Sequence, residues 1–361
     1  DLGLSHELAG DLTGAIDHYQ AALGHWQDLG SLSPWANSLN SLGVVHYLQG
    51  EYDQARTVLN EALLKAQRAG DLRIQAYALA SLGDLQRDLG AYELARGAYA
   101  QALEIARRAH LGLIIPYALD GLGNTARLRG DWPEAAKRLR QTLEHAGQHG
   151  LTHEIGGCHI SLGILANEEG DLQAARRHLD QAVEILTASD LQQPQARAHL
   201  HRAQTAFLSG EGASAQEDLE RALALAGDLG FDQFLVVDGQ HLEDLLRYAA
   251  RQGVGKGVLS GLLERIVAHR QRAAELPPAE LSAATRPAGA EPPLKIYALG
   301  QPVVEVDGQN AQWPVARSRD LFFYLLQDRQ GMSKEQIGAA FWPDHDASRL
   351  DSAFRSTLYR L

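Results

Sequence analysis

The chain has 361 residues, 45% of them hydrophobic, and a formal net charge of −12 at pH 7. This length allows two or three domains, and the single cysteine, Cys158, excludes an internal disulfide and a cysteine-based zinc site. No apolar run approaches the roughly 20 residues that cross a bilayer, and no signal peptide opens the chain, so we expect a soluble, cytoplasmic protein.

The first part of the chain repeats with a period of 40 residues. Leu-Gly occurs at 42–43, 82–83, 122–123 and 162–163, and glycine recurs at 10, 50, 90, 130, 170 and 210. Each glycine of the second series is followed by an alanine and then by a larger residue, such as Leu59 or Tyr99. We expect six units, of which the first lacks its opening helix and the sixth has Arg202-Ala203 in place of Leu-Gly.

This pattern resembles the tetratricopeptide repeat, whose unit is a pair of antiparallel helices. The small residues fall where two helices must approach closely, and the larger ones fill the space around them. The period exceeds the usual length of about 34 residues. Similar lengthened repeats occur in the family of the maltose regulator MalT, which are ATP-dependent transcription factors. HEAT-type repeats share a period of about 40 residues, but they do not explain Leu-Gly. The resemblance implies a mostly α fold, a right-handed superhelix, and an ATPase module ahead of residue 1.

The concave face of such a superhelix is lined by the first helix of each unit and binds peptides or protein segments. These are the partners that the resemblance implies. Tyrosine, asparagine, aspartate and arginine side chains suit such a surface. The alternative is an inner face that is only solvated, or covered by the protein's own domains. Carried over from the Leu-Gly positions, the groove residues are Asn37, Asn40, Tyr47, Tyr77, Asp84, Arg87, Asp88, Tyr117, Asp120, Asn124, Arg127, Asn167 and Glu168.

Two further helices, at roughly 231–252 and 256–275, should close the end of the stack as a cap. We assign residues 1–274 to the solenoid. Residues 275–293 contain five of the twelve prolines and have no helical period, which predicts a linker.

No catalytic constellation is found in the sequence. The glycine-rich stretch 253–257 follows no strand and lacks the hydroxyl of a phosphate loop. His145, His149 and His153 have metal-ligand spacing, but no acidic partner is evident. Cys158 and His159 are adjacent on a helix, so their side chains diverge. We expect no enzyme activity, no cofactor and no metal in this chain.

Residues 294–361 predict a small α+β domain. The β-rich runs 294–300 and 303–308, with Asp307-Gly308 as a turn, indicate an antiparallel sheet. The stretch 312–315 fits a third strand at its edge.

Three helices are expected after these strands. The first is an apolar-rich helix at 317–330. The second begins at Ser333, which with Gln336 forms a capping box, and Pro343 ends it after Phe341. The third spans 347–361, and together the last two form a helix-turn-helix pattern.

This domain resembles the winged helix-turn-helix of OmpR-type response regulators, and most closely that of Streptomyces antibiotic regulatory proteins, which adjoins the bacterial transcriptional activator domain. The resemblance covers 294–361 and is carried by Leu299-Gly300, Val306-Asp307-Gly308, the run 319–326, Phe341-Trp342-Pro343 and the run 356–361. It implies promoter DNA as a partner, with RNA polymerase as a further one, and a third helix that enters the major groove. The chain ends inside that helix, so we expect a fragment that lacks the wing.

The third helix has an apolar side and a side rich in hydrogen-bond donors, as a major-groove helix requires. We predict that DNA is contacted there by Arg349, Ser352, Arg355, Ser356, Tyr359 and Arg360, and at helix starts by Arg317, Arg319 and Lys334.

The charge balance keeps a second interpretation open. Residues 294–361 contain eight basic and eight acidic residues, so the whole net charge of −12 lies outside them. Because DNA-binding modules are usually basic, this neutrality favours an alternative. In it the chain is an interaction scaffold whose winged-helix module docks protein. In the main interpretation, the solenoid receives a protein or ligand signal and controls DNA binding.

Overall fold

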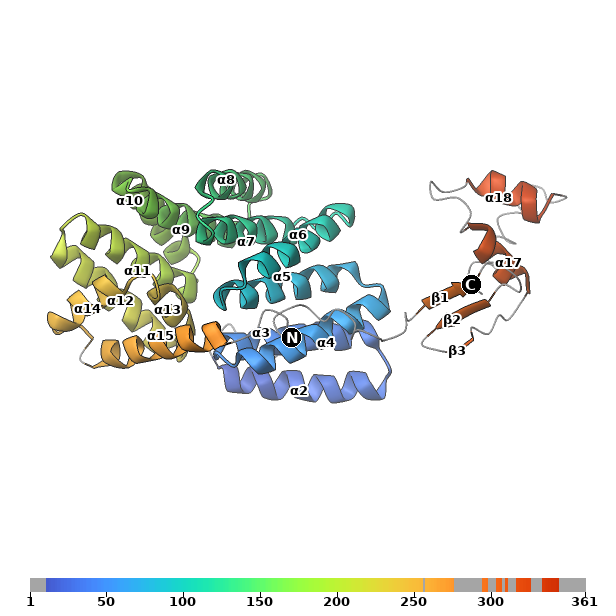
Figure 1. Cartoon of the computed structure of the whole chain (residues 1–361), viewed down its shortest axis with the longest axis horizontal. Helices are drawn as coiled ribbons and strands as arrows, with labels where there is room; N and C mark the ends of the chain where they lie inside the picture. Colours follow the sequence, from blue (N-terminus) through green and yellow to red (C-terminus); the bar gives the residue numbers. More distant parts are fainter. Residues whose placement is uncertain are drawn as a thin grey trace. The chain divides into compact units, whose positions relative to one another are not determined.

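The computed structural model describes residues 11–255, 257–275, 294–297, 303–306, 309–310, 316–325 and 333–343. The chain divides into two compact units, residues 1–284 and 285–361 (Figure 1). No helix among the described residues combines the length and apolar character needed to cross a membrane.

The first unit is a stack of helical hairpins. Its helices are α2 (Leu12–Asp28), α3 (Leu32–Leu48), α4 (Tyr52–Ala69), α5 (Leu72–Asp88), α6 (Tyr92–Arg108), α7 (Ile114–Leu128), α8 (Trp132–His149), α9 (Thr152–Glu169), α10 (Leu172–Ala188), α11 (Gln192–Leu208) and α12 (Gly212–Leu229). The pairs α3/α4, α5/α6, α7/α8, α9/α10 and α11/α12 form the hairpins, and α2 is the second helix of a preceding unit. The predicted superhelix of 40-residue repeats is confirmed.

The turns explain the glycine period. A glycine with positive φ ends nearly every helix, for example Gly70 at +68° and Gly170 at +82°. The left-handed conformation stops the helix and satisfies its last carbonyls. At two equivalent positions, His110 (φ 54°) and Asp190 (φ 52°) adopt the same conformation without being glycine. Aspartates such as Asp71 cap the following helix by accepting a hydrogen bond from a backbone N–H of its first turn.

The glycine of each Leu-Gly pair lies where the two helices of a hairpin touch. A Cβ added at Gly43 would lie 2.6 Å from Cγ of Leu59, and one at Gly83 would lie 2.8 Å from Cε1 of Tyr99. Gly123 and Gly163 face leucines of the next helix in the same way. The large residue of the second helix therefore fills the space that the missing side chain leaves.

The helices that follow α12 do more than cap the stack. They are α13 (Gln233–Gly239), α14 (Glu243–Arg251) and α15 (Val258–Glu275). The prediction of a single helix at 231–252 was wrong. The structure has two helices there, α13 and α14, separated by residues 240–242. Gly239 ends α13 against α15, where an added Cβ would lie 2.7 Å from Ile266.

α13 and α15 reach back to the first hairpins, as Figure 1 shows for α15 beside α3 and α4. The Gln233 side chain donates a hydrogen bond to the Tyr52 hydroxyl over 3.1 Å, and Nε2 of His269 lies 3.1 Å from the carbonyl oxygen of Asp88. The His269 ring packs on Tyr52 at 5.4 Å between centroids, and Arg272 pairs with Asp53 over 2.6 Å. The solenoid is thus closed on itself, which the prediction of an end cap did not anticipate.

The second unit contains a three-stranded antiparallel sheet in the order β1-β2-β3. β1 (Leu294–Tyr297) pairs with β2 (Val303–Val306), so that Leu294 lies opposite Val306, and β2 pairs with β3 (Gln309–Asn310). The antiparallel sheet is confirmed. The edge strand predicted at 312–315 lies outside the described residues, and the third strand occurs earlier, at β3.

Two helices of the second unit pack together. α17 (Ala316–Leu325) and α18 (Lys334–Phe341) bury Leu321, Ile337 and Trp342 in one cluster. The predicted capping box is confirmed, because Ser333 accepts from the backbone N–H of Gln336 and the Gln336 side chain accepts from that of Ser333. The predicted helix at 347–361 lies outside the described residues.

Candidate binding site on the inner face of the solenoid

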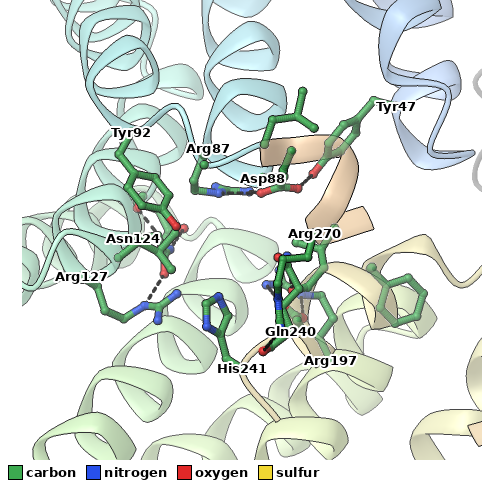
Figure 2. Close-up of a pocket in the computed structure, with 18 of the residues that line it drawn as sticks. Tyr47, Arg87, Asp88, Tyr92, Asn124, Arg127, Arg197, Gln240, His241 and Arg270 are labelled. Carbon is green, nitrogen blue, oxygen red and sulfur yellow. Dashed lines mark hydrogen bonds and ion pairs between the residues drawn. The ribbon is translucent and has the colours of Figure 1, made fainter. Parts of the chain in front are cut away.

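A polar cavity of about 400 Å³ lies on the inner face of the solenoid. Its lining comes from α3, α5, α6, α7 and α11 on the repeat side and from α13, α15 and the α13–α14 turn on the closing side (Figure 2). The closing helices therefore convert an open groove into a bounded site.

One wall of the cavity is an ion-pair network on α3 and α5. Tyr47 donates its hydroxyl hydrogen to one oxygen of Asp88, and Nε of Arg87 donates to the other over 3.0 Å. Arg87 also contacts Tyr99 and Asp84, each at 3.0 Å. Burial raises the pKa of the Asp88 carboxyl, and the Arg87 charge opposes this shift.

A second wall is formed by α7. Nδ2 of Asn124 donates to Asp120 over 2.9 Å, and Arg127 pairs with Glu168 of α9. Arg127 is 91% buried, since 9% of its surface is exposed. Oδ1 of Asp120 is buried and has no hydrogen-bond partner among the described residues. Burial raises the pKa of the Asp120 carboxyl, while Ser161 and the arginines of the cavity oppose the shift.

The α11 and α13–α15 side of the cavity contributes further charged side chains. Arg197 of α11 forms two hydrogen bonds with Asp238 of α13, at 2.7 and 3.1 Å. Burial alone would raise the pKa of Asp238, but the Arg197 charge holds it far below its usual value. His241 lies in the turn after α13, and Arg270 of α15 pairs with Glu243 over 2.7 Å. Burial lowers the pKa of His241, and the nearby arginine charges lower it further.

A smaller cavity of about 240 Å³ adjoins this one and shares Arg127, Asp238 and His241 with it. It is also lined by Asn167 and Gln204, whose Nδ2 and Oε1 atoms are buried without hydrogen-bond partners among the described residues. Unpaired buried polar atoms cost free energy, so the residues around both cavities are not fully satisfied by one another.

The structure brings together about half of the predicted groove residues. Those that line the two cavities are Tyr47, Arg87, Asp88, Asp120, Asn124, Arg127, Asn167 and Glu168.

The other predicted groove residues do not line either cavity. The Asn40 side chain accepts a hydrogen bond from Ser81 over 3.3 Å, and Asp84 accepts from the hydroxyl groups of Tyr99 and Tyr117. The contacts of Ser81 and Tyr117 join neighbouring inner helices, and that of Tyr99 joins the two helices of one hairpin. Asn37 and Tyr77 are half-buried on α3 and α5.

Four charged or ionisable residues of the cavity were not predicted from the sequence: Arg197, Asp238, His241 and Arg270. Arg197 lies in the sixth unit at the position that Tyr77 and Tyr117 occupy in theirs, so the repeat register could have found it. The other three lie in the closing segment 233–275, which contains α13 to α15 and is not part of the repeats. Comparison of equivalent repeat positions therefore could not find them.

Most of the predicted DNA-contact residues, namely Arg349, Ser352, Arg355, Ser356, Tyr359 and Arg360, lie outside the described residues. Arg317 and Lys334 occur in the first turns of α17 and α18. Arg319 pairs with the adjacent Asp320 over 2.9 Å.

The residues considered for catalysis or metal binding have structural partners. The buried Cys158 thiol donates to the carbonyl oxygen of Leu139 over 3.1 Å, and burial raises its pKa. Nδ1 of His159 lies 3.0 Å from Nδ1 of His178 rather than near the thiol. The described residues contain no group of three or more metal-binding side chains.

The fold and the site define a class of protein: a closed α-solenoid with a polar cavity on its inner face. A model of the tetratricopeptide repeat family matches residues 1–67, 35–108 and 115–188, slightly more than half of the chain. The chain belongs to the tetratricopeptide repeat family.

Two solved structures share this fold. A Rap protein complexed with competence and sporulation factor has 18% sequence identity and a TM-score of 0.60, and the match covers 76% of this chain and 74% of that one. The apo form of RapI has 14% identity and a TM-score of 0.54, with 76% and 97% covered. No curated protein matches the chain.

Proposed function

We propose that this chain is an interaction scaffold whose solenoid binds a peptide or protein segment in the cavity of its inner face. The observation that carries the proposal is the convergence of polar side chains from seven helices on one bounded cavity. Such convergence is typical of ligand sites.

The fold supports the same function. A tetratricopeptide stack presents one side of each first helix to a common inner surface, so that side chains distant in sequence act on one ligand. The similar Rap structure is a complex with competence and sporulation factor, which is consistent with ligand recognition by this fold. Nothing in the geometry of the described site favours catalysis.

The proposal is tested with synthetic peptides of 4–15 residues, with free or blocked ends, selected for binding to the full chain. Tyr92→Ala removes a ring that lines the cavity, and we expect the selected peptides to bind this variant about tenfold more weakly or worse, since aromatic anchors dominate such sites. Arg140→Ala, on the exposed side of α8, is the control and should bind as the unmodified chain does. Equal loss in both variants, or in neither, would overturn the proposal.

A second candidate function is DNA binding by the second unit under control of the solenoid. It is favoured by the sequence resemblance and by one structural observation. A three-stranded sheet is followed by α17 and by α18 with its capping box, in the order that the resemblance requires. If this candidate function is correct, the protein is a cytoplasmic bacterial transcriptional regulator.

A salt titration distinguishes DNA binding by the second unit from the alternative that this unit docks a protein. If the second unit binds duplex DNA through phosphates, the logarithm of its association constant must fall steeply and linearly with the logarithm of salt concentration. The titration is followed by fluorescence anisotropy of a labelled duplex. Arg355→Ala should weaken this binding about tenfold. Affinity that is independent of salt would reject DNA as the partner.

A further inference from the structure

Around the cavity, both hydrogen-bond donors and a hydrogen-bond acceptor remain outside the following side-chain contacts. Arg127 uses Nε and Nη1 in its contacts with Asn124 and Glu168, and Arg197 uses Nε and Nη2 with Asp238. Nη2 of Arg127 and Nη1 of Arg197 take no part in these hydrogen bonds. Oδ1 of Asp120 is the corresponding acceptor without a partner.

The donors gather on one side of the cavity. Figure 2 shows Arg127 pointing toward His241, with Arg197 and Arg270 grouped beyond that imidazole. The charges of Arg127 and Arg270 both act on His241, so these groups share one electrostatic environment. A carboxylate placed among them would receive charge-assisted hydrogen bonds, which are stronger than neutral ones.

The charge balance limits what the ligand can be. Each of the four lining arginines already has a carboxylate partner: Asp88 for Arg87, Glu168 for Arg127, Asp238 for Arg197 and Glu243 for Arg270. Asp120 is the one described lining carboxylate with no arginine paired to it. The site therefore has no cationic excess, which disfavours a dianion such as phosphate. A ligand that carries one positive and one negative group matches it.

The closing helices limit the ligand's size. The contacts of Gln233 and His269 with the first hairpins bound the inner face, so a long segment cannot follow the superhelix as it would in an open groove. A cavity of about 400 Å³ lies at the lower end of the range of about 300–1,000 Å³ that is typical of small-ligand sites.

We propose that this cavity binds a short peptide with free ends, its carboxylate among Arg127, Arg197 and Arg270 and its ammonium group at Asp120. This inference rests on the proposed function and specifies its ligand. An ammonium group beside Asp120 supplies the positive partner that this carboxylate does not have among the arginines.

The test uses the full chain and pools of random tetrapeptides, separated from unbound peptide by gel filtration and quantified by mass spectrometry. The pools have free ends, an acetylated amino end, an amidated carboxyl end, or both ends blocked. Because a hydrogen bond to a charged group contributes about 1.5–3 kcal/mol, the pool with free ends should be retained about tenfold or more above each blocked pool. Equal retention of the doubly blocked pool, or retention of none, overturns the inference.

Two variants locate the two ends of the ligand. Asp120→Asn is nearly isosteric and should abolish the preference for a free amino end. Arg270→Gln, at a side chain 53% exposed, should abolish the preference for a free carboxyl end. Arg265→Gln is the matched control, because Arg265 lies on the same helix and pairs with Asp232 outside this cavity. Unchanged preferences in both variants overturn the assignment, and the mild Arg270 change keeps the test valid if the Asp120 variant fails to fold.

A pool of 15-residue peptides with both ends blocked separates this inference from the proposed function. If these peptides bind in a Tyr92-dependent way while no tetrapeptide is retained, the inner face binds a peptide segment and the short-ligand inference is wrong. If neither length binds, both are wrong. Inorganic phosphate at millimolar concentration should not displace the tetrapeptides, and displacement would refute the argument from charge balance.

Discussion

Tyr99 is packed so closely against two glycines that neither position should tolerate a side chain without cost. Its ring is fully buried and lies between Gly83 of α5 and Gly121 of α7. A Cβ added at Gly121 would lie 2.3 Å from Cε1 of the ring, far inside the ordinary contact range of 3.4–4 Å. The ring cannot easily retreat, because its hydroxyl is bonded to Asp84 over 2.6 Å and to Arg87.

Gly121→Ala should therefore destabilise the fold. Overpacking a rigid core costs about 1–3 kcal/mol, and this contact belongs at the upper end. Replacing glycine by alanine within a helix gains about 1 kcal/mol, so the net loss is about 2 kcal/mol. Gly97→Ala is the control: it also lies within a helix, but no atom would lie within 4 Å of its Cβ, so it should gain about 1 kcal/mol.

Urea unfolding followed by circular dichroism at 222 nm measures both effects. The Gly121 variant should unfold at lower urea and the Gly97 variant at higher urea than the unmodified chain. If the two alanines stabilise the protein equally, the close helix approach that we assign to this glycine is wrong. A displaced Tyr99 would also release Arg87, so the Gly121 variant should bind peptides more weakly.

Three further predictions follow from charge and burial. Burial and a neighbouring histidine lower the pKa of His159 from 6.5 to about 4, so the unfolded chain takes up the proton first as pH falls. Stability should be complete above pH 6.5 and fall by up to about 3 kcal/mol toward pH 4, and urea midpoints against pH should flatten in His159→Gln. Asp238→Asn leaves the half-buried Arg197 without its charged partner and should cost about 1.5–3 kcal/mol, whereas Asp53→Asn, in an exposed pair, should cost less than about 1 kcal/mol in the same assay. Cys158 should react with a thiol reagent only as the chain unfolds, because it is 1% exposed and burial raises its pKa; rapid reaction of the folded protein would contradict this.

The repeat could be predicted from the sequence because its signals are local and periodic. A glycine that ends a helix, an aspartate such as Asp71 that caps the next, and the small residue opposite Leu59 each act within one hairpin. Where the pattern lapses, at His110 and Asp190, the neighbouring turns still impose the left-handed conformation. The 40-residue repeat therefore keeps its length even where a turn has a residue other than glycine.

The cavity could be predicted only in part. The inner-face residues Arg87, Asn124 and Arg127 follow from the repeat register. Asp238 and Arg270 do not, because the closure depends on contacts between residues far apart in sequence, such as the 181 positions that separate His269 from Asp88. No local pattern encodes such a contact.

Hydrogen exchange of the full chain with and without a selected peptide tests the central claim most directly. If the ligand lies between the inner helices and the closing segment, protection should rise in 72–88, 114–128, 192–208 and 258–275, which are α5, α7, α11 and α15. Exchange in the outer helices α8 and α10, which do not line the cavity, should not change. Protection confined to those outer helices, with α15 unaffected, would contradict the account.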